Sequence, residues 1–369
     1  MKALPGRRRQ RGIAVITAML VVTIATILAV EITWQTNLDL RRTEGLLAWE
    51  QARQIGLGAE TIAAQAFQEF ISGESGTSET FNQADDAKAC DESPFSYPLN
   101  EGGLTGGVTA RICDVQGRFN LNNLGRFGKD EPEKAIVDQF ARLLQAIVTR
   151  YELTDIEIEA VVAATIDWID ADGTPSFNGA EDDAYTSELP PYRAANYPFL
   201  SLSEWRAVRG VTPELFEAAL LCRCLTAIIP TDGTPTPLNV LTAPEEVYLS
   251  LGDDVTDADA ARWADPGNAG DDEVLFTEIK GSAASFNSMP TYLGKNSDYF
   301  ELNGLVTIGT TNLAMYSLLQ STGNAVVPIR RQFGVEELRP VSDEEASEDD
   351  DDSEDPDPKD LEDLINADE

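Results

Sequence analysis

The amino-acid sequence predicts an α+β protein in which a long N-terminal helix packs on an antiparallel sheet and a large helical domain interrupts that sheet. Three observations support this fold class. A helical pattern without proline runs over residues 13–71, strand patterns occur near 108–120 and again over 298–334, and helical patterns fill the region between them. The two groups of strands are therefore expected to form one sheet that is split in the sequence.

Composition excludes several classes of function. The chain has 369 residues, of which 42% are hydrophobic and 25% charged, enough for about two or three domains with buried cores. Its net charge of −37 disfavours nucleic acid as a partner, since phosphate binding requires a basic surface. It has no histidine, which excludes Ser-His-Asp and Cys-His catalysis and every histidine-ligated metal site. Carboxylates remain as candidate acids, bases or ligands of hard metal ions.

The N-terminal stretch indicates a membrane anchor. Basic residues crowd positions 1–12, and Ile13 to Val30 is an uncharged stretch followed by Glu31. As a helix this stretch is roughly 27 Å long, close to the thickness of the hydrocarbon core of a bilayer. The positive-inside rule keeps the basic residues in the cytoplasm and places the rest of the chain outside, which in a bacterium is the periplasm. A secretory signal peptide fits poorly, because no small-x-small cleavage site followed by a polar mature start is evident.

The helical pattern continues beyond the anchor. Apolar residues recur at approximately helical spacing from Leu38 to Ile71. One helix over 13–71 would be about 85 Å long. The segment 13–72 is therefore predicted to be half membrane span and half amphipathic stalk.

The next segment, 73–122, is predicted to contain the first part of the sheet. Gly, Ser, Asp and Pro are frequent over 73–107, which predicts a loop, whereas 108–115 alternate apolar and polar residues and predict a strand. The GRFNLNNL stretch at 117–124 is typical of a structural turn, and we favour that interpretation over a substrate-binding loop.

The inserted helical domain is predicted over 123–290, and the last strands of the sheet over 291–334. The expected helix N-caps in the insert are Thr154, Ser203 and Thr212. Residues 335–369 form a tail, of which 343–369 contain sixteen acidic residues and one basic residue. Such a run repels itself and has few apolar residues to bury, so we predict that the tail is disordered.

A helix-hairpin-helix pattern occurs at 201–221, and such hairpins can bind the DNA backbone. Only Arg206 and Arg209 are basic near its turn, and the domain is acidic. We therefore interpret it as a helical packing module.

The densest group of carboxylates lies in DWIDADGTPSFNGAEDDAY at 167–185. Its candidate metal ligands are Asp170, Asp172, Glu181, Asp182 and Asp183. With Asp170 as position one, Asp172 and Glu181 fall at positions three and twelve of an EF-hand, but Pro175 stands where that loop needs glycine. The residues alone leave a calcium site and a solvated acidic loop as alternatives. A glycosidase pair of carboxylates would also require a pocket, which the sequence does not reveal.

The four cysteines suggest disulfides in a chain that is predicted to be exported. We favour a bond between Cys90 and Cys113, which would clip a loop onto a strand. Cys222 and Cys224 are separated by one residue, so a bond between them is expected to be strained.

The N-terminus resembles that of the type IV prepilins. A short basic leader ends in Gly12, and an apolar helix begins with a large residue, Ile13. The resemblance implies that a prepilin peptidase cuts between these two residues and methylates the new N-terminus. The family usually has Glu at the fifth mature position, where this chain has Thr17. A subunit with no neighbour above it would leave such a carboxylate unpaired in an apolar environment, which is costly. A plain signal anchor with an uncut leader is the alternative.

Further phrases resemble the K-type minor pseudopilin of the type II secretion system, which lacks this Glu. They are, in order, GRFNLNNL, DWIDADG, NGAEDDAY, NYPFLSLSEW and LNVLTAPEEV, and the resemblance covers roughly residues 7–334. It implies a type IV pilin-like fold, a long N-terminal helix on an antiparallel sheet, with a large inserted helical domain. It also implies calcium near the acidic motif. The acidic tail is not expected from the family core.

The resemblance implies a role in assembly and no enzymatic activity. Such a subunit would span the bacterial inner membrane once, with its globular part in the periplasm. It would help to start the secretion pseudopilus at its tip, together with the I-type and J-type minor pseudopilins and the inner-membrane secretion platform. Two other classes stay open: a minor pilin of a type IV pilus or DNA-uptake system, and a membrane-anchored periplasmic enzyme or binding protein.

Overall fold

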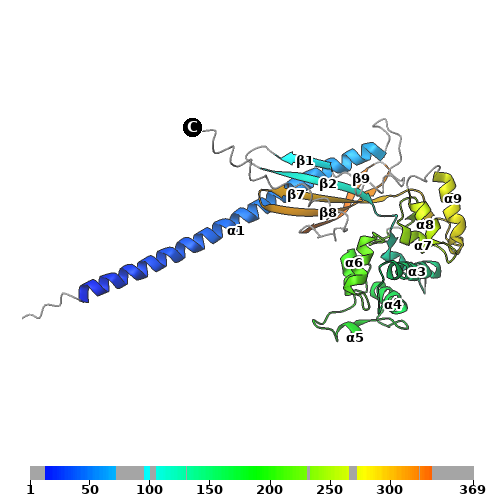
Figure 1. Ribbon diagram of the computed structural model, residues 1–369, viewed down its shortest axis with the longest axis horizontal. Helices are drawn as coiled ribbons and strands as arrows, with labels where there is room; N and C mark the ends of the chain where they lie inside the picture. Colours follow the sequence, from blue (N-terminus) through cyan, green and yellow to red (C-terminus); the bar gives the residue numbers. More distant parts are fainter. Residues whose placement is uncertain are drawn as a thin grey trace, which may run out of the picture.

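The computed structural model describes residues 13–71, 95–99, 105–129, 131–230, 233–265, 272–323 and 325–334. Figure 1 shows three parts: a long N-terminal helix, α1, a sheet against its C-terminal half, and a helical domain at the end of the sheet far from the free half of α1. The fold class is therefore the predicted one.

Helix α1 (Ile13–Ile71) has 59 residues and no break. Side chains from Val15 to Ile32 are exposed around the whole helix, although the stretch is strongly apolar, with a mean hydropathy of 2.5. Within the described part of the chain, α1 alone is long and apolar enough to cross a membrane, by length and composition. The hydroxyls of Thr23 and Thr26 donate to backbone carbonyls four residues earlier, both at 2.8 Å, so these polar groups are satisfied inside the helix.

The C-terminal half of α1 packs on the sheet through small residues and one aromatic residue. Ala52 and Ala64 are buried, and their small side chains allow the helix to approach the strands closely. Phe67 contacts Phe300 edge to face, with ring centroids 4.7 Å apart. Glu60 is also buried on this face, at 1% exposure, and receives a hydrogen bond from Arg331 Nε at 2.6 Å.

The described strands of the main sheet are all antiparallel, in the order β1-β2-β7-β8-β9. Their bounds are β1 Phe95–Leu99, β2 Gly106–Asp114, β7 Tyr299–Ile308, β8 Thr311–Ser321 and β9 Val326–Gly334. Strand β2 pairs with β7, so that Val108 lies opposite Val306. This pairing closes one sheet from two distant segments, and the meander predicted over 298–334 is present.

Two expectations about the first strands were wrong. Strand β1 lies within 73–107, which the sequence assigned to loop, because a short edge strand with Pro98 carries little strand signal. Strand β3 (Phe119–Asn120) does not belong to the main sheet, although 73–122 was assigned to it. It pairs in parallel with β4 (Leu225–Thr226) of the insert, so the first part of the main sheet ends at Asp114.

The insert is built from short helices around one core that contains Phe140, Trp205 and Trp263. Its helices are α3 Lys134–Arg150, α4 Ile158–Ile169, α5 Asp182–Tyr185, α6 Pro213–Leu221, α7 Glu245–Leu249, α8 Asp257–Ala264 and α9 Asp272–Ser282. In its described part the insert also contains short 3-10 helices and strands: η1 Leu121–Leu124, η2 Leu202–Ala207, η4 Ala284–Phe286, β5 Leu238–Asn239 and β6 Leu293–Gly294.

The helix N-termini agree only in part with the predicted caps. Thr212 caps α6, as predicted, by accepting from Leu215 N. Ser201, and not Ser203, caps η2, because Glu204 completes a capping box with it. Helix α4 begins after Glu157, so Thr154 lies outside it.

Most of the GRFNLNNL stretch forms β3 and η1, and not the predicted turn, and its asparagines organise the insert. Asn120 donates to Ile228 O at 2.8 Å, Asn122 accepts from Phe199 N at 2.7 Å, and Asn123 accepts from Thr236 N at 2.7 Å. These three side chains are buried, so each hydrogen bond replaces one that water would make.

Asp114 joins the main sheet to the insert. It ends β2, it is buried, and its Oδ2 accepts from Ser297 Oγ at 2.7 Å and from Asn239 Nδ2 at 3.2 Å. A second link runs from β9, where Arg330 donates to Ala227 O at 2.9 Å. The insert is thus linked to the sheet at the end of β2 and at the edge strand β9.

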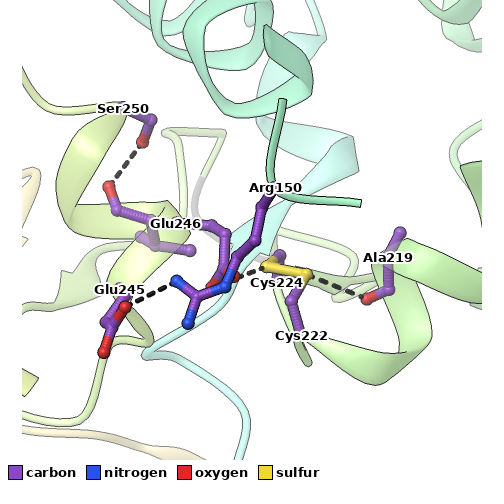
Figure 2. Close-up of a disulfide and its surroundings, with 8 residues drawn as sticks. Arg150, Ala219, Cys222, Cys224, Glu245, Glu246 and Ser250 are labelled. Carbon is purple, nitrogen blue, oxygen red and sulfur yellow. Dashed lines mark hydrogen bonds and ion pairs between the residues drawn. A yellow bond between two sulfur atoms is a disulfide. The ribbon is translucent and has the colours of Figure 1, made fainter. Parts of the chain in front are cut away.

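The structure shows one disulfide pairing that the sequence left open. Cys222 and Cys224 are bonded, with Cα atoms 5.2 Å apart, which lies within the ordinary range for disulfides (Figure 2). The residue between them, Arg223, has a φ of 53°, and this left-handed conformation lets both side chains point to the same side. Cys113 is disulfide-bonded as well. Cys90 lies outside the described residues, so its pairing with Cys113 stays a prediction.

Candidate metal site

The candidate site begins at the C-terminal end of α4 and follows the loop that leads to α5. Asp170 is the C-cap residue of α4, and its Oδ1 accepts from Asp172 N at 3.2 Å. Asp172 Oδ1 in turn accepts from Thr174 N at 2.9 Å. These two successive turns curl the loop and bring the two carboxylates close together.

Three of the predicted ligands come together. Asp170, Asp172 and Glu181 each place one carboxylate oxygen within 4.8 Å of the other two. Calcium binds oxygen at about 2.3–2.6 Å, so oxygens around one ion lie up to about 5 Å apart. The spacing of this carboxylate cluster therefore fits a calcium-sized ion.

Glu181 is the most informative member of the cluster. It is 4% exposed, and neither of its carboxylate oxygens has a hydrogen-bond partner among the residues that the structure describes. Burial, together with the neighbouring Asp167, Asp170 and Asp172, raises the pKa of Glu181 to about 7. A buried carboxylate without a partner is costly, and a cation beside it would reduce that cost.

Arg126 supplies part of the missing charge. Its Nη2 donates to Asp170 Oδ2 at 2.7 Å, and its Nη1 donates to Asp172 Oδ2 at 2.9 Å. Burial raises the pKa of Asp170 and the guanidinium opposes that change, whereas the Thr174 N–H and Arg126 lower the pKa of Asp172. The structure shows no hydrogen bond from Arg126 to Glu181 in its described part.

Two predicted ligands lie outside the carboxylate cluster. Asp182 Oδ1 accepts from Ala194 N at 3.2 Å, and its Oδ2 lies 3.4 Å from Arg193. Asp183 is exposed. Both residues belong to α5, where successive side chains point about 100° apart, so they cannot all follow Glu181 toward the cluster.

One carboxylate was missed by the sequence analysis. Asp167, in the last turn of α4, is fully buried, and both of its oxygens lie near Ser176 N, at 3.2 and 3.1 Å. Gly179 lies so close that a Cβ there would be 1.9 Å from Asp167 Oδ2. The aspartates at 167 and 170 are three residues apart on one helix face, and this spacing was the available signal.

The donor set suits a hard cation. The carboxylate cluster offers only oxygen atoms, and the chain has no histidine. A second group of donors, Cys222, Cys224 and Glu246, also lies close together, but its two sulfurs are bonded to each other (Figure 2). Arg150 neutralises Glu246 there, with Nε 3.1 Å from the carboxylate.

The processing site can be described only from its C-terminal side. Gly12 lies outside the described residues, and α1 begins at Ile13. Thr17 is exposed on the free half of α1. Cleavage between Gly12 and Ile13 stays a prediction.

The comparisons with known proteins agree with this architecture. The family model described as "Type II secretion system (T2SS), protein K" matches residues 117–228. This range covers the three asparagines of β3 and η1 and also the carboxylate cluster. The type II secretion system protein K of Pseudomonas aeruginosa is 30% identical over 85% of this chain and 90% of its own length. The protein of the same name from Pectobacterium carotovorum is 29% identical over 89% of this chain and 98% of its own.

A solved structure supports the fold. It is the crystal structure of the GspK–GspI–GspJ complex from the type 2 secretion system of enterotoxigenic Escherichia coli. The matched chain is 23% identical, the TM-score is 0.58, and the match covers 79% of this chain and 99% of that one. With a long pilin-like helix, a split antiparallel sheet, a helical insert and these relatives, this chain belongs to the type II secretion system protein K family.

Proposed function

We propose that this chain is the minor pseudopilin at the tip of a type II secretion pseudopilus, where it helps to start assembly. The supporting observation is the position of the insert, at the end of the sheet far from the free half of α1 (Figure 1). In a filament of parallel helices, the exposed apolar half of α1 would pack among neighbouring subunits. The insert would obstruct a subunit stacked above it, so the chain suits the top position.

Its partners would be the I-type and J-type minor pseudopilins and the inner-membrane secretion platform. The solved relative was crystallised as a complex of GspK, GspI and GspJ. The globular part would lie in the periplasm, on the side of the membrane opposite the basic leader. The role would be one of assembly without catalysis.

Processing by a prepilin peptidase would remove residues 1–12 and methylate Ile13. Mass spectrometry of the intact protein from its native membrane tests this step directly. A chain that starts at Ile13 with one added methyl group is expected, and a chain that still starts at Met1 would reject the pseudopilin role. The variant Thr17→Glu should still be cut, and loss of cleavage in it would contradict the assigned cleavage position.

The carboxylate cluster would hold calcium and stabilise the loop between α4 and α5. Support comes from the inward position of Glu181, whose carboxylate has no hydrogen-bond partner in the described part of the structure. Asp170, Asp172 and Glu181 would be its ligands, with Asp167 holding the loop in place.

Deletion of the gene tests the proposed role. Loss of protein export, restored by the wild-type chain, is expected. Restoration by a chain that lacks the insert would contradict the tip position, because a subunit without it could be stacked upon. Co-purification of the I-type and J-type proteins with the full chain tests the partners.

A further inference from the structure

We propose that Arg126 is a built-in competitor for the cation at the carboxylate cluster, and that it leaves Asp170 and Asp172 when the cation binds. This inference rests on the calcium site proposed above and adds what sets its affinity.

The hydrogen bonds of Asp170 and Asp172 show why the guanidinium of Arg126 would compete with a metal cation. In both residues, Oδ1 is occupied by a backbone N–H, from Asp172 and from Thr174 respectively. In both residues, Oδ2 is occupied by Arg126, at 2.7 and 2.9 Å. The backbone contacts are part of the loop itself, so an incoming cation would have to take the oxygens that the guanidinium holds.

The charges favour the exchange. Arg126 brings one positive charge to a cluster of three carboxylates. A divalent cation brings two charges and also reaches Glu181, which the described hydrogen bonds of Arg126 leave out. The guanidinium is therefore a partial counter-ion that keeps Asp170 and Asp172 in place until the divalent ion arrives.

Arg126 is also free to move away. Its side chain is 36% exposed, and its Nε is buried without a hydrogen-bond partner among the described residues, so this group would gain hydrogen bonds to water on moving outward. It lies in a loop that turns at Phe127 and Gly128, which have φ values of 45° and 77°. By contrast, the loop between α4 and α5 is held from inside by Asp167 through Ser176 N.

The inference predicts that one variant, Arg126→Gln, will have a higher affinity for calcium and a lower stability without calcium. Arg126→Gln removes the competitor, so calcium should bind roughly tenfold more tightly, which corresponds to about 1.4 kcal/mol. The same variant leaves the aspartates without their counter-ion when calcium is removed, so its melting temperature in a chelator should fall. A purely structural role for Arg126 predicts weaker binding and lower stability together.

The test is calorimetric titration of the full chain in detergent micelles with calcium chloride, after chelator treatment. The control is Arg193→Gln, since Arg193 pairs with Asp182 beside the cluster and touches none of its three members. Arg126→Lys keeps the charge but loses the two-pronged contact, and it should bind calcium with intermediate affinity. This variant also serves if Arg126→Gln does not fold, which circular dichroism would show.

The outcomes separate the two proposals. Tighter binding by Arg126→Gln, with Arg193→Gln equal to wild type, supports the competitor. Equal or weaker binding by Arg126→Gln overturns it and leaves the calcium site standing. If the wild type binds no calcium but Arg126→Gln does, the competitor is supported and calcium occupancy of the natural chain is rejected. If neither chain binds, both proposals fail.

Discussion

The ion pair between the buried Glu60 on α1 and the partly exposed Arg331 on β9 gives the sharpest prediction about how the pilin-like part is held together. Arg331 Nε lies 2.9 and 2.6 Å from the two oxygens of Glu60. Glu60 is 1% exposed, whereas the Arg331 side chain is 41% exposed. Removing the arginine would leave a carboxylate buried without its counter-ion, while removing the carboxylate would leave an arginine that can turn to water.

The expected magnitudes follow from this asymmetry. Loss of one partner of a fully buried pair costs about 3–5 kcal/mol, and the partial exposure of Arg331 reduces this to about 2–3 kcal/mol for Arg331→Gln. Glu60→Gln keeps an acceptor for the guanidinium and should cost about 1 kcal/mol. The double variant should cost less than the sum of the two, because it leaves no buried charge.

Hydrogen exchange of the amides in the second half of α1 is the suitable assay, since it reports the local opening of this helix from the sheet. A matched control is Arg53→Gln, which breaks the more exposed pair with Glu50 on the same helix and should change the exchange rates much less. Equal effects of Arg331→Gln and Arg53→Gln would refute the reasoning, as would full additivity in the double variant.

Three further predictions concern the insert. Asp114→Ala should destabilise the chain by about 2–4 kcal/mol in denaturant unfolding, because Ser297 and other buried donors lose their acceptor, and Asp114→Asn should cost less. The raised pKa of Glu181, about 7 against an ordinary 4.5, means that its contribution to the stability of the calcium-free fold is fully present below about pH 4.5 and is lost as the pH rises through 7. The difference in melting temperature between the wild type and Glu181→Gln in a chelator should follow that course, and a difference that does not change with pH would count against it. Replacing Cys222 and Cys224 by serine should cost only about 1–2 kcal/mol of unfolding free energy, because the loop between them is very short, and a larger loss would show that the bond holds distant parts of the insert.

Local sequence patterns were sufficient to predict those helices and strands whose apolar periodicity extends over many residues. The apolar and amphipathic repeat of 13–71 predicted α1 over its described length, and the alternation over 298–334 predicted three strands of the meander. The same logic failed for β1, whose five residues include Pro98, and for β3, which has two residues and pairs inside the insert. Short elements owe their pairing to partners far away in the chain, and a sequence pattern does not record those partners.

For the candidate metal site, the sequence by itself limited the type of donor atom, but which residues come together depends on the tertiary structure. The acidic loop and the lack of histidine limited the donors to oxygen, and the basic leader before an apolar helix predicted the membrane anchor. Only the fold brought Arg126, from a loop more than forty residues earlier, onto Asp170 and Asp172, and turned Asp182 away along α5. The physical reason is that the sequence specifies the chemical type of each side chain, whereas its neighbours in space depend on how elements that are remote in the sequence pack together.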